Sequence, residues 1–352
     1  MPWSPTFHLT AAVASIVAGV LVGAAGWGSG GAWRALVVPG WAVTLHGMRN
    51  LRMMIYHQCS HRNMYRRRRL DTAVGRAVSG LLVIQNFQRY SREHVSDHHA
   101  AHHMTLRDPT VQAFLLTLRL RPGMSRARMW RRLLVTIVSP RFHAAFAVAR
   151  VRSFWKGAAG SERAVFVVLY GSAFAAAAAT GNLAALLVIW FVPLVPLFQI
   201  SNTLRLCVKH TFPAAAGTGE RRGRAYFAGL TNAIFIGEPA PKGMRPPAWG
   251  RWLLRMAFVH APARYLVLTG DTVVHDFHHR HPASREWAGY LFARQRDLEA
   301  GHPGWPPYTE VWGLVPAIDH VLDSLSAADP SEYDAALVPQ VSGRELFAAF
   351  DD

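Results

Sequence analysis

The sequence contains few cysteines, few acidic side chains and no cofactor-binding signature. Its two cysteines, Cys59 and Cys207, cannot form the disulfide framework of a small secreted protein. Its 21 acidic residues stand against 38 lysines and arginines, so that the net charge is +17. Neither a glycine-rich dinucleotide fingerprint nor a P-loop occurs in the sequence. A nicotinamide or flavin site within the chain is therefore not predicted.

Charged side chains are also missing from three long apolar runs, residues 9–25, 164–179 and 183–200. Because a membrane-spanning helix needs about 20 mostly apolar residues, each run is a candidate span. A fourth run, Trp33–Leu45, reaches that length only if it includes His46 and Met48. We predict four spans, at about residues 9–27, 33–54, 163–180 and 183–201, joined into two hairpins. The expected fold class is an all-α integral membrane protein in which residues 1–352 form one domain.

Arginines are concentrated between the second and third predicted spans. One run is Arg66–Arg69, and a second group comprises Arg119, Arg121, Arg126, Arg128, Arg131 and Arg132. By the positive-inside rule, segments 57–160 and 202–352 and both termini are predicted to be cytoplasmic, in a bacterial-type inner or plasma membrane. This basic face would attract anionic lipid headgroups or an acidic protein partner. No nucleic-acid partner is expected, because the basic residues flank membrane spans.

Three segments carry histidines at helical spacing. The first has His57 and His61 at i and i+4, and the third has His275, His278 and His279 at i, i+3 and i+4. Residues at these separations share one face of a helix, and neutral imidazole is the commonest protein ligand for transition metals. The second segment is the densest, with five of the 18 histidines within ten residues: His94, His98, His99, His102 and His103. Since one zinc ion takes four ligands, eight or more histidines suit two metal ions better.

The three segments, read as HxxxH, HxxxHH and HxxHH around two membrane hairpins, resemble the membrane-bound fatty acid desaturase and hydroxylase superfamily. Arg92 before the second segment, Asp108-Pro109 after it and Pro282 after the third add to the resemblance. Lys209 departs from it, standing where relatives usually have a glutamate. The resemblance implies a non-haem di-iron centre that activates O2. Carried over by position, its ligands are His57, His61, His94, His98, His99, His210, His275, His278 and His279.

The register of the second segment stays open, because His99, His102 and His103 would also give a metal-binding HxxHH motif. His102 and His103 are therefore possible alternative ligands, and Asp271 is a possible additional one. No catalytic residue beyond the metal ligands is expected. Residues 213–250 are expected to be a surface loop, because they are rich in glycine, proline and arginine, and the tail from Trp287 is expected to be a helical cap.

The resemblance implies an O2-dependent desaturase of an acyl chain, or a hydroxylase of a lipid or specialised metabolite on the same scaffold. Both would take electrons from a ferredoxin or cytochrome b5 type donor with its reductase. A histidine-rich metal transporter is a third reading of the same histidines. It is less favoured, because a transporter places polar ligands near the bilayer midplane, and the three clear apolar runs contain no Asp, Glu, Lys, Arg or His.

Overall fold

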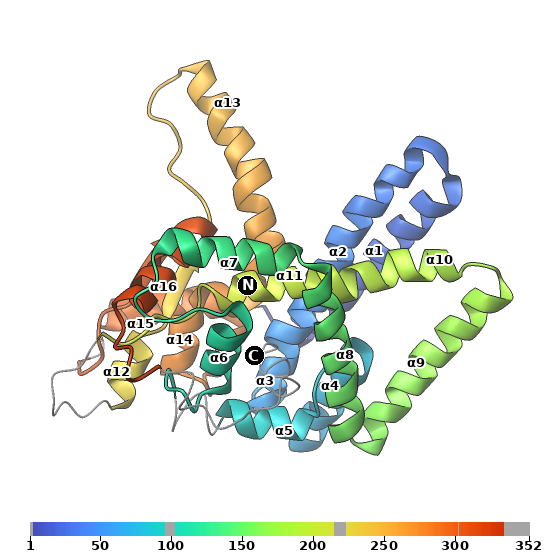
Figure 1. Cartoon of the computed structure of the whole chain (residues 1–352), viewed down its shortest axis with the longest axis horizontal. Helices are drawn as coiled ribbons and strands as arrows, with labels where there is room; N and C mark the ends of the chain where they lie inside the picture. The colour runs from blue at the N-terminus through green and yellow to red at the C-terminus, as the bar shows by residue number, and fades with distance from the viewer. Residues whose placement is uncertain (1–2, 96–102, 215–222, 302, 334–352) are drawn as a thin grey trace.

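The computed structural model describes residues 3–95, 103–214, 223–301 and 303–333, and most of these residues are helical (Figure 1). Two helical hairpins extend from a body that the central and C-terminal helices form. The only strands within the described residues are β1 (Asn232–Phe235) and β2 (Thr309–Trp312), which pair in parallel. The predicted all-α class is thus confirmed, with this small parallel pair added to it.

The first hairpin consists of α1 (Pro5–Ser29) and α2 (Val37–Asn50), joined by a 3-10 turn at Gly31–Leu36. Glycines let the two helices approach closely along their length, as small residues do between membrane helices. A Cβ atom added to Gly19 would lie 2.4 Å from the Thr44 nitrogen, and one added to Gly40 would lie 2.8 Å from the Gly23 nitrogen. Both contacts are with backbone, which cannot give way as a flexible side chain would.

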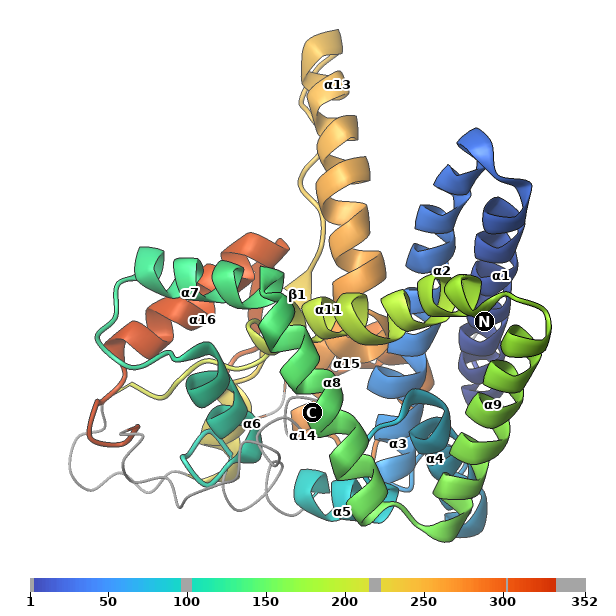
Figure 2. The same ribbon diagram turned by 45° about the vertical axis from the view of Figure 1, so that its right-hand side comes forward.

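Helix α2 does not end at the hairpin but continues through a π-helical turn (Leu51–Tyr56) into α3 (His57–Ser60). The next helices are α4 (Arg68–Leu82), α5 (Phe87–Arg92) and α6 (Pro109–Gln112). Asp108 caps α6 by accepting a hydrogen bond from the Thr110 amide at 2.9 Å. The continuous path from α2 to α3 places the first histidine segment directly below the first hairpin (Figure 2).

The second hairpin is reached through α7 (Arg126–Val138) and α8 (Pro140–Gly157), which meet at a bend of 66°. Its first arm is α9 (Gly160–Ala179). Its second arm is α10 (Leu183–Leu186), two π-helical turns (Leu187–Phe191 and Pro193–Leu197) and α11 (Phe198–Leu206). The Trp41 indole donates a hydrogen bond to the Val188 carbonyl at 2.7 Å and so links the two hairpins.

Three helices of the described residues are long and apolar enough to cross a membrane: Pro5–Ser29, Gly160–Ala179 and Leu183–Leu206. The bent pair α7–α8 would be a fourth if it forms one broken span. The predicted span at 33–54 is a helical arm of the first hairpin from Val37 onward, but it is not among these three. It carries Arg49 and Arg52, whose side chains are buried within the protein. Three or four spans therefore agree with the predicted membrane protein.

The C-terminal part of the chain lies mostly to one side of the two hairpins (Figure 1). After α12 (Arg224–Gly229) and β1, helix α13 (Pro246–Arg255) runs through π-helical turns at Met256–His260 and Ala263–Val267. A 3-10 turn (Gly270–Val274) leads into α14 (His275–Arg280), and another (Trp287–Gly289) leads into α15 (Tyr290–Ala300). The chain then forms β2 and α16 (Leu314–Ala327). The expected helical cap is present in the described part of the tail, which also contributes β2, and residues 334–352 lie outside the described residues.

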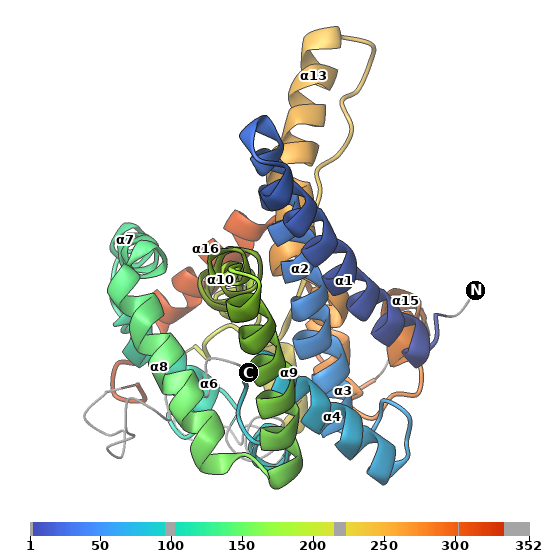
Figure 3. The ribbon, with the colours of Figure 1, turned by 90° about the vertical axis from the view of Figure 1, so that its right-hand side faces the viewer.

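The expectation of a surface loop over residues 213–250 is wrong for about half of its described part. This segment contains α12, β1 and the first half of α13, and α13 projects from the body in all three views (Figure 3). The prolines that suggested a loop, Pro246 and Pro247, instead begin the helix, where a missing amide proton costs nothing. The Trp252 indole and the Arg255 guanidinium both donate hydrogen bonds to Glu238. These bonds hold the segment that precedes α13 against the helix.

Candidate metal centre

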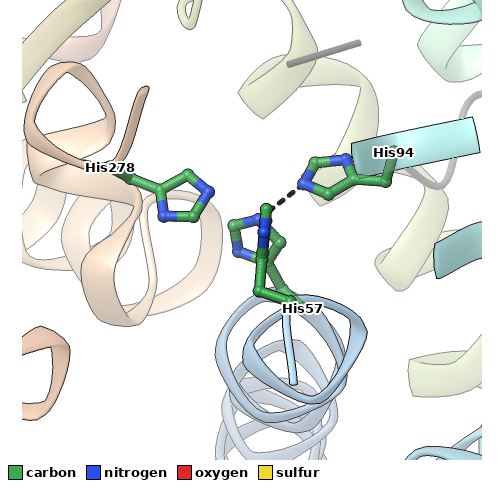
Figure 4. A group of neighbouring side chains, drawn as sticks. His57, His94 and His278 are labelled. Carbon is green, nitrogen blue, oxygen red and sulfur yellow. Dashed lines mark hydrogen bonds between the residues drawn. The ribbon is translucent and has the colours of Figure 1, made fainter. Parts of the chain in front are cut away.

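Four histidines from three separate segments form the first group. His57 begins α3, His61 follows its last residue, His94 follows α5, and His278 lies on α14. Their ring nitrogens all lie within 4.8 Å of one another. The Nε2 atoms of His57 and His94 are 2.8 Å apart, and the His57 ring lies between those of His94 and His278 (Figure 4). The fold thus brings together residues from the first, second and third histidine segments.

Three histidines form the second group. His210 follows α11, and His275 and His279 lie one turn apart on α14. The Nε2 atom of His275 is 3.3 Å from that of His210 and 3.1 Å from that of His279. All three rings are buried. The isolated bridge between His210 and Thr231 fixes the backbone of His210 against the chain that leads into β1.

Helix α14 contributes to both groups, which the spacing of its histidines alone did not indicate. Adjacent residues of an α-helix are rotated by about 100° about its axis. His278 and His279 accordingly point in different directions, with their ring planes at 88°. The sequence predicted that His275, His278 and His279 would act on one face, but the structure divides them between the two groups. The short helix therefore joins the two groups, with the His275 and His278 ring centroids 5.9 Å apart.

The separations of the ring nitrogens fit a metal ion at each group. A metal–imidazole bond of about 2.0–2.1 Å would place two ligand nitrogens at right angles about 3 Å apart. The observed separations of 2.8, 3.1 and 3.3 Å lie close to that value. Buried imidazoles that converge without an apolar partner between them are unusual in a protein core. The donor sets are therefore of the kind that holds transition metals such as zinc, iron or copper.

Burial keeps these imidazoles in the form that binds metal. The pKa of His57 is held well below its usual value, mainly by burial and further by the neighbouring histidines and Lys209. The pKa of His275 is lowered in the same way, with burial again the largest cause and Lys209 the next. A lowered pKa means that the ring is neutral at pH 7, with a lone pair available for a metal ion.

The second segment is only partly described. His98, His99 and His102 lie outside the described residues, so the structure places only the two ends of the segment, His94 and His103. These two ends approach different groups. The buried ring of His103 has its centroid 4.6 Å from that of His210 and 4.7 Å from that of His279. One segment thus reaches both groups, as α14 does.

Asp271 lies beside the first histidine segment but belongs to neither group of converging ligand atoms. It is buried and accepts a hydrogen bond from the Gln58 amide at 3.1 Å. Burial raises the pKa of Asp271 to about 6, so that a fraction of this carboxyl group is protonated near neutral pH. In this structure Asp271 fixes the side chain of Gln58, the residue that follows His57, through this hydrogen bond. Metal ligation by Asp271 stays a prediction.

Basic side chains, which sequence reasoning did not place in the site, line the small cavity beside the two groups. The cavity is bounded by Arg52, Arg205 and Lys209, together with His57, His94 and His275. The Arg52 guanidinium lies over the ring of Tyr90, 4.4 Å from its centroid. Lys209 is also buried, at the position where the resemblance led us to look for a glutamate. The one signal in the sequence was that each of these cations is within five residues of a proposed ligand.

A buried ion pair connects α14 to α15 and, through Glu310, to β2. Asp276, next to His275, receives hydrogen bonds from the Arg294 guanidinium at 2.9–3.1 Å, and Arg294 also bonds Glu310 at 2.7 Å. Arg294 is on α15 and Glu310 is on β2. This network ties the helix that carries three of the seven converging histidines to the C-terminal elements. Such carboxylate contacts fix the orientation of metal-binding segments.

The fold and the site together define a helical membrane protein with two buried histidine groups that could hold metal ions. The family model for fatty acid desaturases matches residues 32–254, and the chain belongs to this family. It is therefore an enzyme of the desaturase or hydroxylase kind. The match ends before α14. The assignment of the third histidine segment to the site therefore rests on the fold and not on the family match. A search of the curated proteins finds no match to this chain.

Proposed function

We propose that the two groups hold two iron ions and that the protein is an O2-dependent desaturase of acyl chains. The observation that carries this proposal is the pair of adjoining buried histidine groups that share α14, in a chain of the fatty acid desaturase family. Bound iron would supply the activation of O2 that an unactivated C–H bond requires. Neither group takes a ligand from the three apolar span helices, which argues against a metal transporter.

The proposed ligands follow the geometry. His57, His61, His94 and His278 would hold the first ion, and His210, His275 and His279 the second. His98 or His99 would complete the second set, or His103, whose ring already lies beside it. Burial and the charge of Lys209 keep the His57 and His275 rings neutral, and the ion pair of Asp276 with Arg294 holds α14 in place. The enclosing C-terminal helices would exclude bulk water from the reacting atoms.

The proposed reaction consumes electrons that the chain does not supply. Removing two hydrogens from an acyl chain with O2, two electrons and two protons yields an alkene and two waters. We propose a ferredoxin or cytochrome b5 type protein with its reductase as the donor. A hydroxylase on the same scaffold would use the same inputs, placing one oxygen atom in the product and the other in water. The substrate would be an acyl lipid or a related metabolite, and segments 57–160 and 202–352 would face the cytoplasm with both termini.

The test is metal analysis followed by product analysis. Purified protein grown with added iron should contain about two irons per chain, as two imidazole-rich sites require. With a ferredoxin, its reductase and acyl substrates, mass spectrometry should find a product that has lost two hydrogens. A product that gains one atom from labelled O2 would identify the hydroxylase instead. A single zinc per chain, unchanged by iron supply, would refute the di-iron proposal.

A further inference from the structure

A large groove opens at the surface beside the bent helix pair α7–α8, away from the histidine groups. Its volume is about 760 Å³, and its walls are residues 116–119, α7 and the first turns of α8. Four arginines line it, Arg119, Arg131, Arg132 and Arg141. Between them lie apolar side chains, among them Leu116, Val135 and Phe142. The lining therefore combines strong positive charge with an apolar floor.

No acidic residue lines the groove. Within the described residues, none of its four arginines forms an ion pair or a side-chain hydrogen bond. Arg126, at the start of α7, differs from these four arginines, because it forms an ion pair with Asp323 at 2.9 Å. Cations that share one groove repel one another, and an anion bound among them would relieve that repulsion. A planar guanidinium presents two parallel N–H donors, which match the oxygens of a phosphate group.

The backbone at Arg119 supports a built site. Its φ angle is +55°, in the left-handed region that favours glycine, so this conformation costs free energy for an arginine. Arg119 follows the π-helical turn Ala113–Thr117 and also lines a second groove of about 500 Å³, together with Arg121. Backbone strain at a residue that faces two grooves is of the kind found at ligand sites.

Exposed apolar residues adjoin the groove along α7. Leu134, Val135 and Val138 are 49%, 61% and 72% exposed, and Val135 also lines the groove itself. Helices α7 and α8 together have the length and apolarity of a broken membrane span. A soluble anion would leave these side chains in water, whereas a lipid would cover them with its chains. The juxtaposition of arginines and exposed aliphatic side chains matches the two parts of a phospholipid.

We propose that this groove binds one anionic phospholipid, with Arg119, Arg131 and Arg132 around its phosphate. Its acyl chains would lie over Leu134, Val135 and Val138. The bound lipid would hold the bend between α7 and α8 against the bilayer, with α8 joined to the second hairpin. This site is independent of the proposed iron site, because no residue of the groove belongs to a histidine group.

The test uses the full chain in an uncharged detergent, titrated with short-chain phosphatidylglycerol and followed by calorimetry. One saturable site per chain is expected. The variant R119Q/R131Q/R132Q should bind on the order of 100-fold more weakly, since each arginine near a lipid surface contributes about 1 kcal/mol, which is about fivefold in affinity. R119K/R131K/R132K should retain most of the affinity, and unchanged circular dichroism and iron content would show that both variants fold.

The charge-matched control is R67Q/R68Q/R69Q, which removes three exposed arginines from a different basic surface. It should bind phosphatidylglycerol within about threefold of the parent. Equal weakening in both glutamine variants would overturn the proposal in favour of diffuse attraction. Inorganic phosphate that binds as tightly as the lipid would make the groove a free-phosphate site and also overturn it. Equally tight binding of phosphatidylcholine would overturn it as well. If R119Q/R131Q/R132Q lost binding to an acidic ferredoxin but kept its lipid affinity, the groove would be a protein docking site and the proposal would also fail.

Discussion

The division of α14 between the two histidine groups can be tested by removing one imidazole at a time. His278→Ala removes a ligand from the first group, and His279→Ala removes one from the second. Binding of a structural metal through four ligands contributes about 10–16 kcal/mol, so one ligand accounts for roughly 3 kcal/mol. Each variant should therefore bind one of its two irons on the order of 100-fold more weakly. Turnover should be lost in both, because the proposed reaction needs both ions.

Double variants separate the two groups more sharply than single ones, because residues that share a site are not additive. His57→Ala with His278→Ala removes two ligands from one group and should leave about one iron per chain. His278→Ala with His279→Ala also removes two imidazoles, but from different groups, and should leave almost none. His320→Ala, which lies on α16 outside both groups, is the control for a lost histidine. Iron would be measured after dialysis against a weak chelator, and equal iron content in the two double variants would refute the division.

Three further predictions concern packing, thiol reactivity and electron supply. Gly40→Ala should cost about 1–3 kcal/mol of unfolding free energy, measured by denaturation in detergent, because its Cβ meets backbone. Gly28→Ala, whose Cβ meets nothing within 4 Å, should cost little, and an equal loss would contradict the close packing. Burial raises the pKa of Cys59 and Cys207, so iodoacetamide at pH 8 should label neither in the native protein, by mass spectrometry. Charge reversal across the exposed Arg66–Arg69 should raise the ferredoxin concentration needed for half-maximal activity and weaken its salt dependence, and an unchanged salt response would argue against docking there.

Periodicity in the sequence was sufficient to predict the helical membrane class and the three histidine segments. Long uncharged runs can only be buried in lipid or protein, and histidines at i and i+4 stay neighbours in any α-helix. These local rules hold wherever the helix is placed. They explain why His57 and His61 lie in one group, and why spans were found near Leu9 and Leu183.

Long-range geometry could not be predicted in the same way. The spacing of His275, His278 and His279 is compatible with one metal or two, and only the positions of α3 and α11 decide the division. The helix at Pro246 was missed because proline is common both in loops and at the first positions of helices. The buried cations Arg52 and Lys209 were not placed in the site, because burial of a charge depends on contacts that local patterns do not contain.

The π-helical turns have a consequence for how this enzyme can change. Such turns precede three of the four parts of the chain that supply the converging histidines. Leu51–Tyr56 precedes His57 and His61, Pro193–Leu197 precedes α11 and His210, and Ala263–Val267 precedes α14. A π turn holds one residue more than an α turn, which rotates everything after it by about 100°. Deleting a single residue there would aim His57 and His61 away from their partners while leaving every ligand in the sequence. For the histidines that follow such a turn, the number of residues between the membrane and the ring is therefore as strict a requirement as the histidine itself. Engineered insertions or deletions are best confined to the exposed turns at the hairpin tips.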